Sequence, residues 1–193
     1  MLLSFFIMKK ERGVFMFRLS TAQISRIGLF TALTIIMSQI SIPMPYGVPM
    51  TMQTFIIPLV AFLLGKKEGT YVSIIYMILG LVGLPVFAGF TGGLSIILGP
   101  TGGFILSFPL MAYCSGIASE KESKISVISW LVIGAILNYL VGMFYFSLMT
   151  SSTLMVAFTA CVLPFIPTAI IKIVLVYFVG EKLKKLNFKK IKA

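Results

Sequence analysis

The stretch "PTAIIKIVLVYFVG", residues 167–180, is strongly apolar except for one lysine, Lys172, near its middle. No acidic residue lies within eight positions of Lys172 on either side. A charge at the centre of a bilayer costs about 2.5–3.5 kcal/mol on insertion scales. The apolar residues predict a membrane helix, and the isolated lysine predicts a role that offsets the cost of placing it there.

The rest of the sequence has the same apolar character, with 59% hydrophobic and 11% charged residues. A soluble domain would not bury that much apolar surface, so the composition indicates a polytopic membrane protein. A membrane-spanning helix needs roughly 17–25 residues. Six runs meet or approach this length, and they lie at 22–42, 48–64, 69–87, 102–119, 125–149 and 155–180. We therefore expect an all-α fold with six transmembrane helices over 22–180, preceded by an N-terminal segment 1–21 and followed by a basic tail 181–193.

The basic residues alternate with uncharged connections along the chain. Of the 16 lysines and arginines, all but Lys172 lie before or early in the first run, between runs two and three, between runs four and five, or after the sixth. The connections at about 43–52, 88–101 and 150–154 carry no charge. The positive-inside rule then places both termini in the cytoplasm. We interpret the net charge of +11 as topology and attraction to anionic lipid, with no nucleic-acid partner.

Several kinds of chemistry are missing from the sequence. It has no histidine or aspartate, and its five acids are glutamates in the predicted cytoplasmic segments. Neither an acid–base pair nor a metal site assembles from that inventory within the membrane, so we expect no enzyme, no cofactor and no metal. The stretch "GPTGGF" lacks the Gly-Lys-Ser/Thr ending of a phosphate-binding loop. Uphill transport would therefore need energy from another subunit.

A glycine-rich segment, "GLPVFAGFTGGLSIILGPTGGF" at 83–104, lies on the predicted outer side. Its seven glycines, interleaved with large apolar residues, favour a folded lid or re-entrant segment over an ordinary flexible loop. The ligand contacts expected from this segment are Phe87, Gly89, Phe90, Gly92, Gly93, Thr101, Gly102 and Gly103.

Four other positions have two readings each. Gln53, which follows the proline-rich stretch containing Tyr46, either bonds between helices or contacts a ligand amide. Asn138 shares a helix face with Gly134 and Gly142, and there it either joins helices or faces a ligand. Lys172, with Thr168 one turn before it, either bonds to a backbone carbonyl or side-chain dipole or pairs with a bound ligand, and the ligand is the expected partner. Gly28-x-x-x-Ala32 forms either an internal packing motif or a docking face for a partner.

Three stretches together resemble the BioY family, the biotin-binding S components of energy-coupling-factor (ECF) transporters in prokaryotes. They are "QISIPMPYGVPMTMQT", the glycine-rich segment and "PFIPTAIIKIVL", and the resemblance spans about 22–180. It implies a cell-membrane protein that captures biotin from outside and works with a transmembrane coupling protein and two cytoplasmic ATPases. It also implies that Gly28 and Ala32 contact the coupling protein, and that Tyr46 and Gln53 belong to the ligand site.

The resemblance fails at one position. The family pattern Pro-x-Asp-x-x-Lys reads "PTAIIK" here, so Lys172 matches and Ala169 replaces the aspartate. An acceptor for the ureido N–H groups is absent at that position, and the neighbouring Thr168 is a partial substitute. Two alternatives stay open: an S component for another small anionic vitamin or cofactor precursor, and a membrane scaffold without a ligand.

Overall fold

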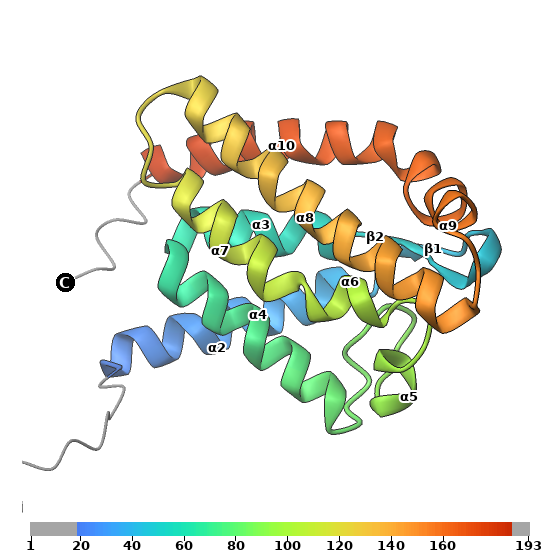
Figure 1. The fold of residues 1–193 in the computed structure, drawn as a ribbon. Helices are drawn as coiled ribbons and strands as arrows, with labels where there is room; N and C mark the ends of the chain where they lie inside the picture. Colours follow the sequence, from blue (N-terminus) through green and yellow to red (C-terminus); the bar gives the residue numbers. More distant parts are fainter. Residues whose placement is uncertain (1–18, 187–193) are drawn as a thin grey trace, which may run out of the picture.

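The computed structural model describes residues 19–186. Most of the predicted N-terminal segment 1–21, and the part of the predicted tail beyond residue 186, lie outside this range. The described chain is mostly helical (Figure 1). Its helices are α2 (Thr21–Ser38), α3 (Gln53–Leu64), α4 (Lys66–Leu81), α5 (Leu94–Ile97), α6 (Gly102–Leu106), α7 (Phe108–Ala118), α8 (Lys124–Thr150), α9 (Leu154–Cys161) and α10 (Ile166–Lys185), with short 3₁₀ turns η2 (Pro45–Gly47) and η3 (Leu163–Phe165).

Three helical stretches of the described chain are long and apolar enough to cross a membrane. They are α2, α8 and the run Leu154–Lys185, which contains α9, η3 and α10. Helices α3 and α7 are apolar but shorter. This arrangement is that of a helical membrane protein, whereas the count of six spans stays a prediction.

The all-α prediction misses a small β-hairpin between α2 and α3. Strands β1 (Ser41–Ile42) and β2 (Met50–Thr51) pair antiparallel. The prolines at 43, 45 and 49 lack the N–H that a helix needs, so the chain between the strands does not continue either helix. The turn instead uses positive φ at Tyr46 (68°) and Gly47 (76°). The second predicted run therefore begins as a strand, and its helix starts only at Gln53.

Two predicted spans are broken by local sequence. The run 102–119 divides at Ser107 into α6 and α7, with Pro109 in the first turn of α7. The run 155–180 divides at η3, where Pro164 and then Pro167 occupy the first turns of η3 and α10. Residues beside each break, Phe104 and Phe108 at the first and Phe165 at the second, line the candidate site described below.

Helix α3 forms the centre of the core. Its side chains from Phe55 to Phe62 are buried, as expected for a helix that is apolar on all sides. Helices α4, α7 and α10 pack around it. An ion pair between Arg26 of α2 and Glu68 of α4, at 2.9 Å, joins two of the outer helices.

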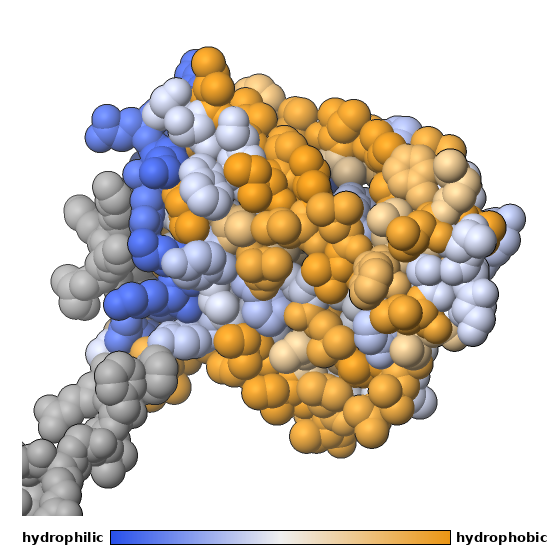
Figure 2. Space-filling model, in the orientation of Figure 1, coloured by the Kyte–Doolittle hydropathy of each residue, from blue (hydrophilic) through white to orange (hydrophobic). Residues whose placement is uncertain are grey.

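Polar residues gather at one end of the molecule. The start of α2 and the end of α10 both lie at this end (Figure 1). Figure 2 shows hydrophilic side chains there and apolar side chains over most of the remaining visible surface. Lys66 bonds Glu120 at 3.0 Å, and Lys184 donates to the carbonyl of Ser119, which brings three of the predicted cytoplasmic segments together. The hairpin, α5 and α9 lie at the opposite end (Figure 1).

Candidate ligand-binding site

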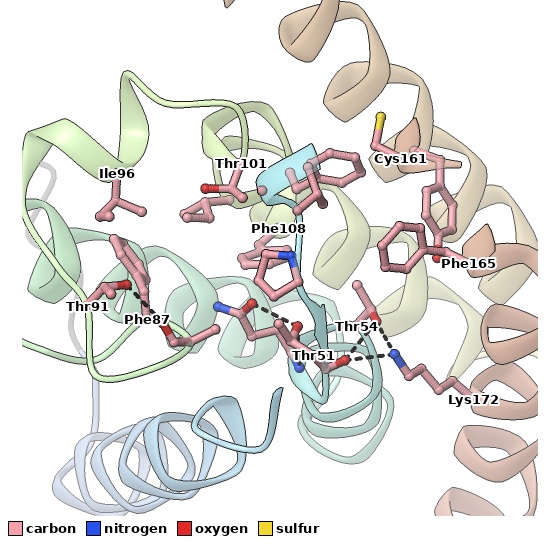
Figure 3. A pocket seen from close by; sticks show the side chains of 18 residues that line it. Thr51, Thr54, Phe87, Thr91, Ile96, Thr101, Phe108, Cys161, Phe165 and Lys172 are labelled. Carbon is pink, nitrogen blue, oxygen red and sulfur yellow. Dashed lines mark hydrogen bonds between the residues drawn. The ribbon is translucent and has the colours of Figure 1, made fainter. Parts of the chain in front are cut away.

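A cavity of about 220 Å³ lies near the end that carries the hairpin, α5 and α9 (Figure 3). Its walls come from segments far apart in the sequence, and they combine aromatic and aliphatic side chains with a few polar groups. The lining residues are Gly47, Val48, Pro49, Thr51, Gln53, Thr54, Phe87, Ala88, Thr91, Ile96, Thr101, Phe104, Ile105, Phe108, Tyr139, Cys161, Phe165 and Lys172. An apolar cavity with few, placed polar groups is typical of small-molecule sites.

Lys172 enters this cavity from α10. Its Nζ donates to the carbonyl oxygen of Thr51 at 2.7 Å and to Oγ1 of Thr54 at 2.9 Å. Within residues 19–186, no carboxylate forms an ion pair with Lys172. An ammonium group has three N–H donors, so the two neutral acceptors leave one donor and the full charge for a bound molecule.

Gln53 lies beside Lys172's acceptors, at the start of α3, and its side chain is already engaged within the fold. Its Oε1 accepts from the Thr51 hydroxyl at 2.9 Å, and its Nε2 donates to the Tyr76 hydroxyl at 2.6 Å. Tyr76 in turn donates to the carbonyl of Val86 at 3.1 Å. Both readings of Gln53 therefore have structural support, since it lines the cavity and also links β2, α3, α4 and the chain that leads into Phe87.

The first half of the glycine-rich segment, 83–93, folds against the cavity as a tight loop. The N–H of Phe87 donates to the carbonyl of Thr91 at 2.9 Å, and both residues line the cavity. The N–H of Gly93 is anchored to the carbonyl of Gly80 at 2.7 Å, in a left-handed conformation (φ 94°) that favours glycine. This half is an ordered wall of the site.

The glycines of the segment mainly permit close packing. A Cβ on Gly92 would meet the carbonyl of Leu84, and a Cβ on Gly102 would meet that of Ile97. Gly103 abuts the side chain of Tyr145. Of the ligand contacts expected here, Phe87 and Thr101 line the cavity, whereas Gly89, Phe90, Gly92, Gly93, Gly102 and Gly103 do not. Phe90 is 72% exposed.

The remaining expected site residues lie near the cavity without lining it. Asn138 donates to the carbonyl of Phe104 at 2.9 Å and to Oγ of Ser107 at 2.7 Å, which joins α8 to the break between α6 and α7. Thr168 faces a lateral groove between α10 and the hairpin. Ala169 borders a smaller cavity beside the main one. Tyr46, at the tip of the hairpin, is exposed.

Several lining residues have no counterpart in the sequence-based prediction. Thr51 and Thr54 flank Gln53, and their polarity within an apolar stretch was a usable signal. Cys161 and Phe165 reach the cavity only because η3 redirects the chain between α9 and α10. Nothing in their local sequence distinguishes them from packing residues.

The predicted docking motif lies on the outside of α2. Gly28 and Ala32 are both exposed, and a Cβ on Gly28 would meet no atom within 4 Å. The apolar side chains of Ile24 and Leu29 beside it are also exposed. In the described part of the chain, this small-residue motif therefore packs against no second helix, and its docking role stays a prediction.

Comparisons with known proteins agree with this architecture. The chain is 37% identical over 162 residues to a probable biotin transporter BioY of Pyrococcus horikoshii, covering 84% of this chain and 96% of that protein. It is 37% identical over 166 residues to a biotin transporter BioY of Thermotoga maritima, covering 86% and 97%. A solved S-component for biotin from an ECF-type ABC transporter matches with a TM-score of 0.78 at 27% identity, over 84% of this chain and 90% of that one.

The family match itself covers residues 8–188, which includes every residue of the cavity. The relatives are matched over nearly their whole length. On this match, and with the fold of a solved S-component, the chain belongs to the BioY family.

Proposed function

We propose that this protein captures biotin as the S subunit of an ATP-driven vitamin importer. The single observation that carries the proposal is Lys172, a cation without an acidic partner among the described residues, placed on the wall of a largely apolar cavity. Biotin combines an apolar thiophane ring, a neutral ureido group and a carboxylate tail. Aromatic walls, neutral polar groups and one ammonium group complement these three parts.

The same proposal explains the distribution of charge. With both termini and the basic connections in the cytoplasm and six crossings of a prokaryotic plasma membrane, the cavity opens toward the outside. The glycine-rich segment, 83–104, then acts as an outer lid over biotin. The ordered loop at Phe87 and Thr91 supports this role, because it already forms a wall of the cavity.

Energy for transport would come from other subunits. The sequence contains no intramembrane acid or histidine to couple transport to protons, and no phosphate-binding loop. We therefore propose a transmembrane coupling protein and two cytoplasmic ATPases as partners, with Gly28 and Ala32 on the docking face. The chain itself has no catalytic role in this proposal.

The direct test is calorimetric titration of the purified protein with biotin and, as a control, with the cationic vitamin thiamine. We expect biotin to bind at one molecule per chain and thiamine to be rejected by the unpaired charge of Lys172. Mass spectrometry of small molecules that co-purify checks the same point. Retention of a different anionic vitamin, with no biotin binding, would overturn the assignment of the ligand.

A further inference from the structure

The side-chain oxygen of Asn138 is the starting point. Asn138 is 1% exposed, and both hydrogens of its amide are used, one by the carbonyl of Phe104 and one by Oγ of Ser107. These two bonds determine the orientation of the amide. Among residues 19–186, no group donates a hydrogen bond to its Oδ1. A buried acceptor of this kind normally has a donor, either from the protein or from an ordered water.

A small cavity of about 20 Å³ lies next to this residue. It is separate from the main cavity, but two of its lining residues, Thr54 and Tyr139, line both. Its remaining walls are mainly apolar and include Ala135 and Ala169. A cavity needs about 10–15 Å³ of this kind of volume to hold one water molecule, so it has room for a single water and not for a part of a larger ligand.

The hydroxyl group of Thr54, which lines the same small cavity, is a donor with a poor acceptor. Its oxygen accepts from Lys172 at 2.9 Å, and among the described residues 19–186 its own proton has only the carbonyl of Thr51, at 3.5 Å. That distance is long for a hydroxyl donor, whose bonds usually measure about 2.7–2.8 Å. The same carbonyl already accepts from Lys172 at 2.7 Å. Among the described residues, the small cavity is therefore lined by one acceptor without a donor, Oδ1 of Asn138, and by one donor without a close acceptor, the hydroxyl of Thr54.

We propose that one ordered water occupies this small cavity, donates to Oδ1 of Asn138 and accepts from the hydroxyl of Thr54. The water orients the lone pairs of Thr54 toward Lys172 and so holds the ammonium group on the wall of the main cavity. Asn138 is then a positioning residue that acts on the ligand through the water, Thr54 and Lys172. This inference deepens the proposed function and rests on it for its binding measurements.

The structural test needs no ligand. A crystal structure of the ligand-free protein at a resolution that shows ordered water should place one water within hydrogen-bond distance of both Asn138 Oδ1 and Thr54 Oγ1. A dry cavity, or a water that contacts only one of the two, overturns the proposal. If wild-type protein binds no biotin, the proposed function fails, and this crystallographic result still decides the question of the water.

The binding test uses substitutions at two positions, Thr54 and Ala135, and leaves Asn138 intact. Thr54→Val removes the hydroxyl at nearly constant shape and is expected to weaken biotin binding about tenfold, while Thr54→Ser restores it. Ala135→Val fills the small cavity and is expected to weaken binding severalfold. The same change at Ala22, on the exposed face of α2, serves as the control and should have no effect.

The double variant gives the sharpest result. If the water acts through Thr54, adding Ala135→Val to Thr54→Val should cause no further loss, because the water no longer has a hydroxyl to orient. Losses that simply add would mean that the two sites act independently, which would overturn the proposal.

Discussion

The ammonium nitrogen of Lys172 lies 2.7 Å from the carbonyl oxygen of Thr51, although 121 positions separate the two residues in the chain. The contact joins α10 to the last residue of the β-hairpin. Placing a charged side chain within the hydrocarbon core of a membrane costs free energy, and neutral dipoles offset that cost only partly. The contact therefore holds the amino group of Lys172 on the cavity wall, where a bound anion or polar ligand completes its hydrogen bonding.

Lys172→Met should weaken biotin binding while leaving the fold intact. Methionine keeps most of the apolar stem but removes the charge that the ligand would pair. A hydrogen bond to a charged group contributes about 1.5–3 kcal/mol, which corresponds to a loss of roughly tenfold to over a hundredfold. Calorimetry measures the loss, with Lys121→Met in the connection between α7 and α8 as the control. Unchanged affinity would refute the pairing of Lys172 with the ligand.

Ala169→Asp tests the position where the sequence leaves the family pattern. The new carboxylate would lie one turn before Lys172 on α10, next to the main cavity. For biotin, we expect equal or tighter binding, because the carboxylate can accept from the ureido N–H groups while pairing with the lysine. The side chain would also displace the proposed water from the small cavity that Ala169 lines, and its carboxylate would replace that water as an acceptor for the Thr54 hydroxyl. Ala169→Asn has a similar size without the charge and separates the two effects. Loss of biotin in the aspartate variant alone would show that this pocket departs from the family plan.

Gly28→Leu and Ala32→Leu should reduce biotin uptake by cells without changing biotin affinity. Both positions are exposed on α2, at a distance from the residues that line the cavity, so a larger side chain obstructs a partner helix and not the ligand. Uptake and co-purification with the coupling protein are the two measurements. Ala22→Leu, also exposed on α2, is the control. A fully assembled transporter carrying either substitution would argue against this docking face.

Gly102→Ala should destabilise the protein. The added methyl group would meet the carbonyl of Ile97, which already accepts a hydrogen bond from the Tyr145 hydroxyl at 2.8 Å. Overpacking against a fixed backbone costs about 1–3 kcal/mol. Thermal unfolding in detergent checks this, with Gly28→Ala as the matched control because nothing lies within 4 Å of its Cβ. Equal melting temperatures for both variants would contradict the packing argument.

Tyr76→Phe should loosen the wall of the cavity at Val86 and Phe87. The change leaves Nε2 of Gln53 without its acceptor and removes one of two donors to the carbonyl of Val86, which keeps its bond from Nε2 of Gln39 at 3.1 Å. An unsatisfied buried polar group costs about 1–3 kcal/mol. Hydrogen exchange at residues 83–93 should therefore speed up, whereas Tyr113→Phe, at a half-exposed tyrosine, should not change it. Identical exchange in both variants would mean that this network does not hold the loop.

The sequence alone was sufficient for the class of the protein. Hydrophobicity and charge are read residue by residue along the chain. The apolar runs and their basic flanks therefore identify a helical membrane protein without knowledge of any tertiary contact. The position of Lys172 near the middle of an apolar run can also be read from the sequence. So can the absence of an acidic residue within eight positions of it. The glycine-rich segment and the stretch around Gln53 were also recognisable, because their residue types resist continuous helix.

Only the tertiary structure decided which side chains form the site. Phe87 and Gly89 are neighbours in one loop, yet one lines the cavity and the other does not, since the bridge from Phe87 to Thr91 turns the chain between them. Cys161 and Phe165 enter because η3 redirects the chain, and Thr51 becomes the partner of Lys172 only when the hairpin meets α10. Such contacts join residues far apart in sequence, and their geometry depends on how every intervening helix packs. Local patterns of hydrophobicity carry no information about that packing.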